Sequence, residues 1–318
     1  MKQLVIWALI LGGVGYGGAK FYLHHEVADT MDKAVLMMSP YADVEYDGVR
    51  STMSGELTIE GIRVKVHDFR DELRIDRLGI DTPSFLSLLE ISDFVTMQGK
   101  GVPDYFGFLV EGMHIPTDAD YFDEIYQFNA QFRGANDPGD AAATCTGKFG
   151  FSPDALSALG YQEQVFSMAM SVRNTAGKFS IELDSRVDEM FDINANVTLA
   201  GDLMTEVYKG SASRPRLSDL TIDYTDRSLN DRVRKYCKQM GLSEEEIVTA
   251  QMDTFKFVGE MYGIEFDEYM LTPYLQFLNG KERITITAKP NSPIALSQID
   301  LYKASDVPAL LNLEARAY

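Results

Sequence analysis

Two neighbouring stretches of the chain carry the same pattern of apolar and polar residues. Residues 56–64 (ELTIEGIRV) and residues 72–80 (ELRIDRLGI) both place apolar side chains at alternate positions and then shift that alternation by one residue. The shift falls at Gly61 in the first stretch and after Ile75 in the second. Alternation with a period of two is typical of a strand with one buried face, and glycine tolerates a bulge best. The repeat therefore predicts two neighbouring strands that bend at the same level, as in a curved antiparallel sheet.

One face of these two strands should be apolar. A face of this kind either contacts an apolar ligand, as a groove would, or forms part of the ordinary core of the protein. Its candidate residues are Leu57, Ile59, Ile62, Val64, Leu73, Ile75, Leu78 and Ile80.

Further strands and helices follow from the same kind of pattern. Alternation predicts strands over residues 166–172, 179–183, 191–199, 220–224 and 283–288, with a hairpin loop at 174–177. Residues 99–139 mix glycine, proline and aromatic residues, and we expect a helix near 119–132. A helical section near 228–278 contains the capping box Ser243–Glu246, although Pro273 lies inside its last helix. Short helices are expected at 85–89, 153–159 and 307–311.

The N-terminus contains one long apolar segment. Residues 4–23 carry a single charge, Lys20, and a helix of this length spans about 30 Å, which is the thickness of the hydrocarbon core of a bilayer. With Lys2 on the cytoplasmic side, the rest of the chain would lie outside the cell membrane. The alternative is a cleaved signal peptide, because Gly17, Gly18 and Ala19 offer small residues at a cleavage site.

These patterns predict an α+β fold, which is a curved antiparallel β-sheet, groove-like in one interpretation, with helical insertions and one preceding transmembrane helix. Residues 1–23 are the membrane anchor or signal, and residues 24–40 form a helix that is a stalk or the first core helix. Residues 41–318 form the exported β-rich body.

Charge narrows the range of partners. The chain has 29 basic and 48 acidic residues, for a net charge of −19. The negative electrostatic field of such a chain repels nucleic acid. The acidic composition also argues against a polybasic patch that would bind anionic lipid head groups. We therefore expect membrane association through residues 4–23, and no nucleic-acid partner.

The two cysteines, Cys145 and Cys237, permit one intramolecular disulfide. An oxidising compartment favours such a bridge. A bridge that closes a loop of about 90 residues would stabilise the fold by roughly 4–5 kcal/mol, if its effect is to lower the conformational entropy of the unfolded chain. The alternative is that Cys237 is a small buried apolar residue on a helix.

No catalytic chemistry is evident in the sequence. The four histidines are His24, His25, His67 and His114, and the chain has no H-E-x-x-H, C-x-x-C or G-x-S-x-G spacing. The sequence therefore predicts no catalytic residue, no metal site and no cofactor, and we expect that the protein is not an enzyme.

Several of these stretches together resemble a known family. The apolar N-terminal segment, VEYDGV at 44–49, SGELTIEGI at 54–62 and LGIDTPS at 78–84 resemble the N-terminal module of AsmA-like bacterial envelope proteins. FSPDAL at 151–156 and DRSLNDR at 226–232 resemble an uncharacterised set of proteobacterial periplasmic proteins. The AsmA-like resemblance covers about a quarter of the chain. The whole chain is far shorter than the large members of that family.

The resemblance implies a single-pass protein of the bacterial inner membrane, with its N-terminus in the cytoplasm and its body in the periplasm. It also implies that an apolar face of the sheet contacts or transfers lipid. The alternative function is a structural or protein-interaction module that binds another envelope protein through a sheet edge or the helical hairpin.

Overall fold

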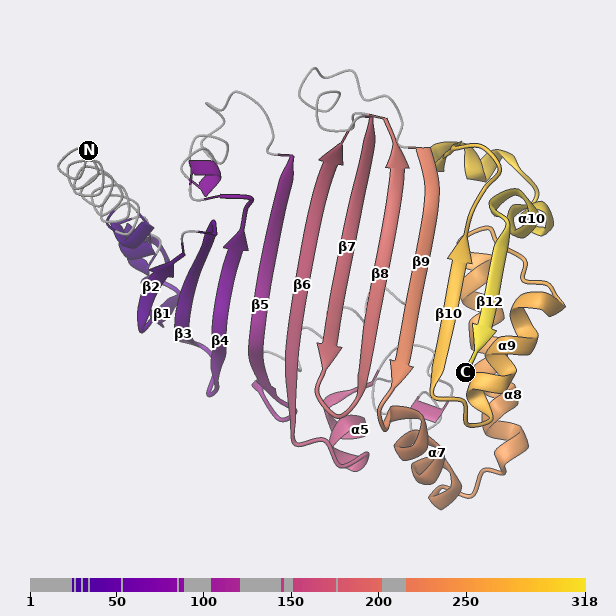
Figure 1. Cartoon of the computed structure of the whole chain (residues 1–318). Helices are drawn as coiled ribbons and strands as arrows, with labels where there is room; N and C mark the ends of the chain where they lie inside the picture. Colours follow the sequence, from indigo (N-terminus) through magenta and orange to yellow (C-terminus); the bar gives the residue numbers. More distant parts are fainter. Residues whose placement is uncertain are drawn as a thin grey trace, which may run out of the picture.

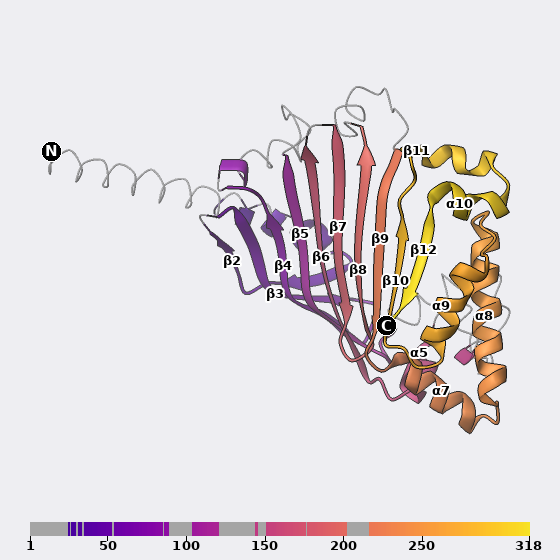
Figure 2. The same ribbon diagram turned by 45° about the vertical axis from the view of Figure 1, so that its right-hand side comes forward.

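The computed structural model describes residues 25, 27–29, 31–33, 35–52, 54–84, 86–88, 104–120, 144–145, 151–175, 177–201 and 216–318. In this part of the chain one sheet of 12 strands is antiparallel throughout and follows the order β1-β3-β4-β5-β6-β7-β8-β9-β10-β12. Strand β2 also pairs with β3, and β11 with β9. Figures 1 and 2 show that the sheet is open and curved. The predicted α+β fold with a curved antiparallel sheet is confirmed.

From β3 to β10 each strand is the neighbour of the next one in the chain. Short loops join β3 to β4, β6 to β7 and β7 to β8, whereas longer segments join β4 to β5, β5 to β6 and β9 to β10. Their bounds are β1 Ala42–Glu45, β2 Gly48–Ser51, β3 Glu56–Val66, β4 Glu72–Asp81, β5 Tyr105–Pro116, β6 Glu163–Thr175, β7 Lys178–Val187, β8 Phe191–Ala200, β9 Arg216–Asp226, β10 Arg283–Ala288, β11 Ile294–Ala295 and β12 Leu313–Ala317.

Most of the described helices lie on one side of the sheet, behind it in Figure 1, toward the C-terminal strands. At the start of α8 the Ser243 hydroxyl accepts from the backbone N–H of Glu246, whose carboxylate accepts from the backbone N–H of Ser243. The helices are α5 Pro153–Ala158, α7 Leu229–Gln239, α8 Glu244–Met261, α9 Glu268–Leu278 and α10 Val307–Leu311, with 3₁₀ turns η1 Leu296–Leu301 and η2 Ala304–Asp306.

Two predicted segments fall largely outside the described residues. The membrane segment, residues 4–23, lies outside them entirely, and only residues 119 and 120 of the expected helix at 119–132 are described. Within the described ranges no helix combines the length and apolar character needed to cross a membrane. The described residues between 25 and 38 are helical, as the pattern predicted.

The shift of alternation at Gly61 extends over three strands. The register between β3 and β4 is continuous and sets Gly61 opposite Asp76, and the register between β4 and β5 sets Asp76 opposite Gly112. The β5–β6 ladder absorbs the extra residue, because its register shifts between Val110 and Met113. The apolar residues on both sides of this level therefore share one face of the sheet.

At this level of the sheet an aspartate side chain lies against a glycine twice: Asp47 against Gly61, and Asp76 against Gly112. We call these four residues the Asp–Gly row. Gly61 and Gly112 have φ angles of 62° and 63°, in the left-handed region that favours glycine. A Cβ atom on Gly61 would overlap the Asp47 carboxylate, and one on Gly112 would overlap the Asp76 carboxylate. The Gly112 N–H donates to Ser167 Oγ at 3.1 Å, which satisfies a donor at the register shift.

The buried clusters lie toward the helical end of the sheet. One joins α5, α7 and the start of α8 to the β7–β8 turn, where Val187 and Met190 are buried. A second joins α10 to Phe179, Leu199 and Leu217 of β7, β8 and β9. A third packs α9 against Ile284 of β10. The helices thus supply a second layer for the C-terminal half of the sheet.

Candidate functional site: the apolar face of the sheet

The eight apolar residues singled out in the sequence lie together on β3 and β4. Residues that pair across an antiparallel ladder point to the same face, so each pair forms one step of an apolar band. The steps are Leu57 with Ile80, Ile59 with Leu78, Ile62 with Ile75 and Val64 with Leu73. The Asp–Gly row passes between the second and third pairs, and the band continues across it.

The band extends over two further strands. Phe108 and Val110 of β5 pair with Ile80 and Leu78 on one side, and with Met170 and Met168 of β6 on the other. Below the Asp–Gly row, Met113 joins Ile75 to Phe166. We use the name apolar band for the eight residues of β3 and β4 with Phe108, Val110, Met113, Phe166, Met168 and Met170.

Strand β5 was not predicted from the sequence, although Phe106, Phe108 and Val110 alternate there. Gly112 breaks this alternation after only three apolar positions, so the strand resembles an irregular stretch rich in glycine and aromatic residues. Gly112, the extra residue that keeps β5 in register with β4, therefore also interrupts the period-two pattern by which the strand could have been predicted.

Most of the band is only half-buried. Among its residues Ile62 and Val110 are buried, and the others retain part of their surface. The described helices α7, α8, α9 and α10 gather at the other end of the sheet, where α9 packs on β10 and β12 (Figure 2). The band is thus a continuous apolar surface with exposed area remaining on it.

The opposite face of the same strands is polar. Leu109 lies on it, because a Cβ atom on Gly79 would be 3.6 Å from the Leu109 Cβ and 3.1 Å from the Thr58 methyl group. Two open hollows of about 400 Å³ and 490 Å³ share Leu109, Ala169 and Asp184 in their lining. Leu109 is therefore an apolar side chain placed beside the band but on the other face.

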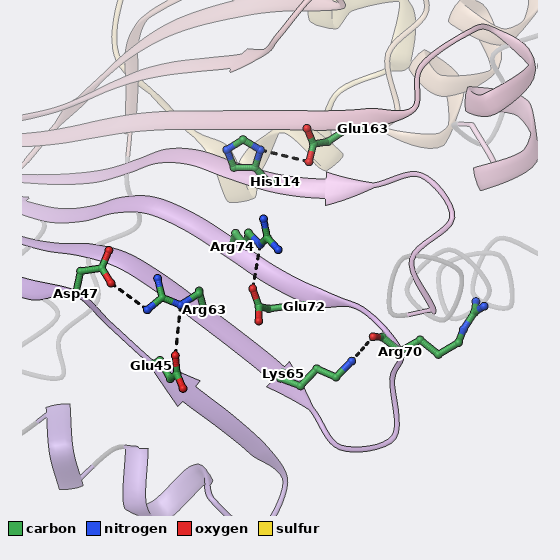
Figure 3. Close-up of polar contacts among 9 residues, drawn as sticks. All are labelled: Glu45, Asp47, Arg63, Lys65, Arg70, Glu72, Arg74, His114 and Glu163. Carbon is green, nitrogen blue, oxygen red and sulfur yellow. Dashed lines mark hydrogen bonds and ion pairs between the residues drawn. The ribbon is translucent and has the colours of Figure 1, made fainter.

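Ion pairs hold many of the charged side chains of this polar face. Arg63 Nη2 lies 2.9 Å from Asp47 Oδ1, and Arg77 Nη2 lies 2.5 Å from Glu111 Oε2. His114 Nδ1 lies 3.3 Å from Glu163 Oε1 (Figure 3). Within the described ranges no group of three or more His, Cys, Asp and Glu side chains could hold a metal ion.

The strongest pKa shifts lie away from the apolar band. Burial raises the pKa of Tyr274 to about 12, and burial together with Asp226 raises the pKa of Tyr224 still further. Hydrogen bonds from the Arg70 side chain and backbone lower the pKa of Asp120 to about 2. Each shift has a local structural cause, in the packing of α9 on the sheet or in an ion pair between loops.

Cys145 and Cys237 form a disulfide with a Cα–Cα distance of 5.7 Å. Both cysteines are buried in the cluster that contains α5 and α7. The bond closes a loop across 92 positions of the sequence and attaches the described residues 144–145 to α7. It lies in the helical part of the protein, and the cluster around it reaches the apolar band at Phe166, which packs against it.

Comparison with protein-family models gives a match over the C-terminal part of the chain. A protein-family model described as "Uncharacterized protein" matches residues 150–318. No curated protein matches the sequence. The matched range begins just before α5 and contains every later strand and helix of the fold.

Proposed function

The chain belongs to the family described as "Uncharacterized protein", and we propose that it is a non-enzymatic, membrane-anchored envelope protein whose apolar band contacts the acyl chains of lipid. In this proposal residues 4–23 hold it in the bacterial inner membrane and the sheet lies in the periplasm. The AsmA-like resemblance of the N-terminal stretches supports the same interpretation.

The observation that carries the proposal is the continuity of the apolar band across four strands. Neighbouring strands lie about 4.8 Å apart, so the band from β3 to β6 is about 14 Å wide. This is about half the roughly 30 Å thickness of a bilayer hydrocarbon core, and therefore matches the length of one acyl chain. Because the side chains of the band are only half-buried, an acyl chain that covered their remaining apolar surface would bind with a favourable free energy.

Apolar burial and net charge both favour contact of the band with the acyl chains of a lipid over contact with its head group. Each buried CH₂ group contributes about 0.8 kcal/mol, so a chain laid along the band could bind without any charged contact. The net charge of −19 opposes attraction to anionic head groups at long range. The proposal therefore assigns recognition to the apolar part of the lipid.

Labelling with a diazirine-bearing palmitate in living cells tests this function. After irradiation the full-length chain is purified and the peptides that carry acyl adducts are identified by mass spectrometry. We expect adducts on peptides from β3–β6. Adducts on residues 4–23 would report the anchor separately. Acyl adducts confined to the N-terminal segment would overturn lipid contact by the sheet.

Two variants on neighbouring strands sharpen the test. Leu78→Asp places a charge on the apolar band, whereas Leu109→Asp places the same charge on the polar face. We expect β3–β6 adducts to fall about tenfold in Leu78→Asp and to stay near the wild-type level in Leu109→Asp, since 1.4 kcal/mol corresponds to a factor of ten. Equal losses in both variants would contradict recognition by the band.

A structural or interaction module of the cell envelope is the second candidate function. It is favoured by the position of β1 at the end of the sheet, where its described pairing is with β3 alone. Such an edge can accept a strand from another protein. Protection of the β1 amides from hydrogen exchange in cell extracts, compared with the purified chain, would support this function over lipid contact.

A further inference from the structure

The tip of the α8–α9 hairpin carries a group of exposed apolar and aromatic side chains. Met261 is 66% exposed and Tyr262 is 71% exposed at the end of α8. Leu301 is 80% exposed on the neighbouring segment that contains η1 and η2. Val258 and Tyr302 are also exposed, at 41% and 46%. We call these five residues the tip patch.

The two segments that carry the tip patch are joined to each other. The Glu265 N–H donates to the carbonyl oxygen of Ala304 at 3.1 Å. Ile264 and Ile299 pack on the same buried cluster, which contains Val307 and Leu311 of α10. Figures 1 and 2 both place the upper end of α8 beside this segment. The patch is therefore fixed by contacts on its inner side.

The hairpin does not need the tip patch for its own packing. On the inner side of α8, Phe255 stacks on Phe266 and Tyr274, with ring centroids 4.5 Å and 4.1 Å apart. Gly259 is buried, and a Cβ atom there would lie 2.5 Å from a carbon of the Phe266 ring. The tip patch lies on exposed positions of the same turns, and clustered exposed apolar residues of this kind mark interaction surfaces.

Charges around the patch restrict the type of partner. Glu260, Glu265 and Glu268 are exposed, and none of them forms an ion pair with another described residue. Lys256 lies four residues before Glu260 on α8, and Lys303 lies between Tyr302 and Ala304 in the neighbouring segment. Both lysines are exposed, but the three glutamates together with the exposed Asp267 and Asp306 leave the rim net acidic. This acidic rim opposes an anionic membrane surface, and a second copy of a chain with a net charge of −19 would be repelled as well.

We propose that the tip patch binds a segment of another protein that presents apolar side chains flanked by lysine or arginine. Tyrosine and methionine are enriched in the buried centres of interfaces, and the carboxylates would lie in the polar rim where complementary charge sets the partner. This inference is independent of lipid contact by the apolar band, which lies at the other end of the sheet.

Site-specific photo-crosslinking in cells tests the inference with the full-length chain. A benzophenone side chain replaces Tyr262 in one strain and Tyr41, which is 69% exposed near β1, in another. We expect a protein adduct at position 262 that is absent at position 41, and mass spectrometry should locate the adduct in a basic, apolar segment of the partner. A lipid adduct, an adduct with a second copy, an acidic partner segment or equal adducts at both positions would overturn it.

Charge reversal supplies the matched control. Glu260→Lys with Glu265→Lys reverses the rim, whereas Glu245→Lys reverses an exposed carboxylate at the opposite end of α8. We expect the adduct at position 262 to fall at least about tenfold in the rim variant and to persist in Glu245→Lys. An adduct that survives the rim variant would show that the acidic rim does not select the partner.

Discussion

The two ends of the sheet use the same alternation of apolar and polar residues but differ in what lies against it. At the C-terminal end, α5, α7, α9 and α10 cover β7–β10 and produce three buried clusters. At the N-terminal end, the apolar residues of β3 and β4 pair with one another and most remain half-buried. Alternation therefore specifies a face, and a second layer decides whether that face becomes a core.

The family match follows the same division. Residues 150–318 include β6–β12, the described helices from α5 onward and the buried residues of the three clusters apart from Cys145, whereas β1–β5 precede the matched range. The C-terminal part has the buried area from which most of the stability should come. The N-terminal strands should depend on the sheet for their order, and four sets of substitutions test this difference.

Removing the disulfide should have the largest effect. We expect Cys145→Ser with Cys237→Ser to lower the free energy of unfolding by about 4 kcal/mol, because the bond closes a long loop in the unfolded chain. Urea denaturation measures the loss, and added reductant should destabilise the wild type but not the variant. Hydrogen exchange should rise in α5 and α7 more than in β3 and β4. A uniform rise would contradict the division of the sheet into two regions.

A matched pair of isoleucines compares the two ends directly. Ile247 of α8 is 2% exposed in a buried cluster, whereas Ile59 of β3 is half-buried on the apolar band. We expect Ile247→Ala to cost about 3 kcal/mol through lost burial and a cavity, and Ile59→Ala to cost about half as much. Chemical denaturation gives both values. Equal costs would mean that the band is covered as completely as the core.

The Asp–Gly row gives a local test at the N-terminal end. Gly61→Ala should cost about 2 kcal/mol, because the left-handed backbone disfavours a Cβ atom and because that atom overlaps the Asp47 carboxylate. Gly177→Ala is the control, since Gly177 has a φ of 77° but a Cβ atom there would meet nothing within 4 Å. It should cost about 1 kcal/mol. Adding Asp47→Ala should reduce the difference, and a difference that stays unchanged would exclude the carboxylate as its cause.

The smallest effect is expected at Asp226, where β9 leads into α7. Burial raises the pKa of this carboxyl above its usual value of 3.8, although the N–H of Asn230 donates to it and partly offsets the shift. A raised pKa means that the folded state binds the proton more tightly, so stability is lost as the pH rises from below about 3.8 through the folded value.

Asp226→Asn should therefore increase the free energy of unfolding at pH 7 by less than about 1 kcal/mol, because the partly exposed carboxyl is screened by water. The gain should vanish at pH 3, where the wild-type carboxyl is protonated. Urea denaturation at both values of pH checks this, and a loss of stability at pH 7 would show that the charged form is required.

Local patterns predicted the elements whose signal is contained in one stretch. The strand at 283–288 coincides with β10, and the helix predicted from the capping box at Ser243 corresponds to α8, Glu244–Met261. The eight band residues could be named from the repeat alone. Strand β5 was missed, because its alternation is interrupted at Gly112 and its apolar face is completed by pairing with β4 and β6.

The Asp–Gly row and the position of the helices could not be predicted for a related reason. Asp47, Gly61, Asp76 and Gly112 come from four separate segments, and nothing within one segment indicates that they lie at one level of the sheet. The hairpin loop at 174–177 is local and was recognised, whereas the packing of α9 on β10 and β12 depends on contacts between distant residues.

The extra residue shared by β3, β4 and β5 limits how these strands can change in length. Deleting Gly61 alone would move Ile62 and Val64 to the polar side while β4 kept its own phase. Deleting Asp47, Gly61, Asp76 and Gly112 together would leave every apolar pair intact and would restore an unbroken ladder to β6. Insertions and deletions in this part of the chain should therefore be tolerated as a matched set across neighbouring strands, and rejected one at a time.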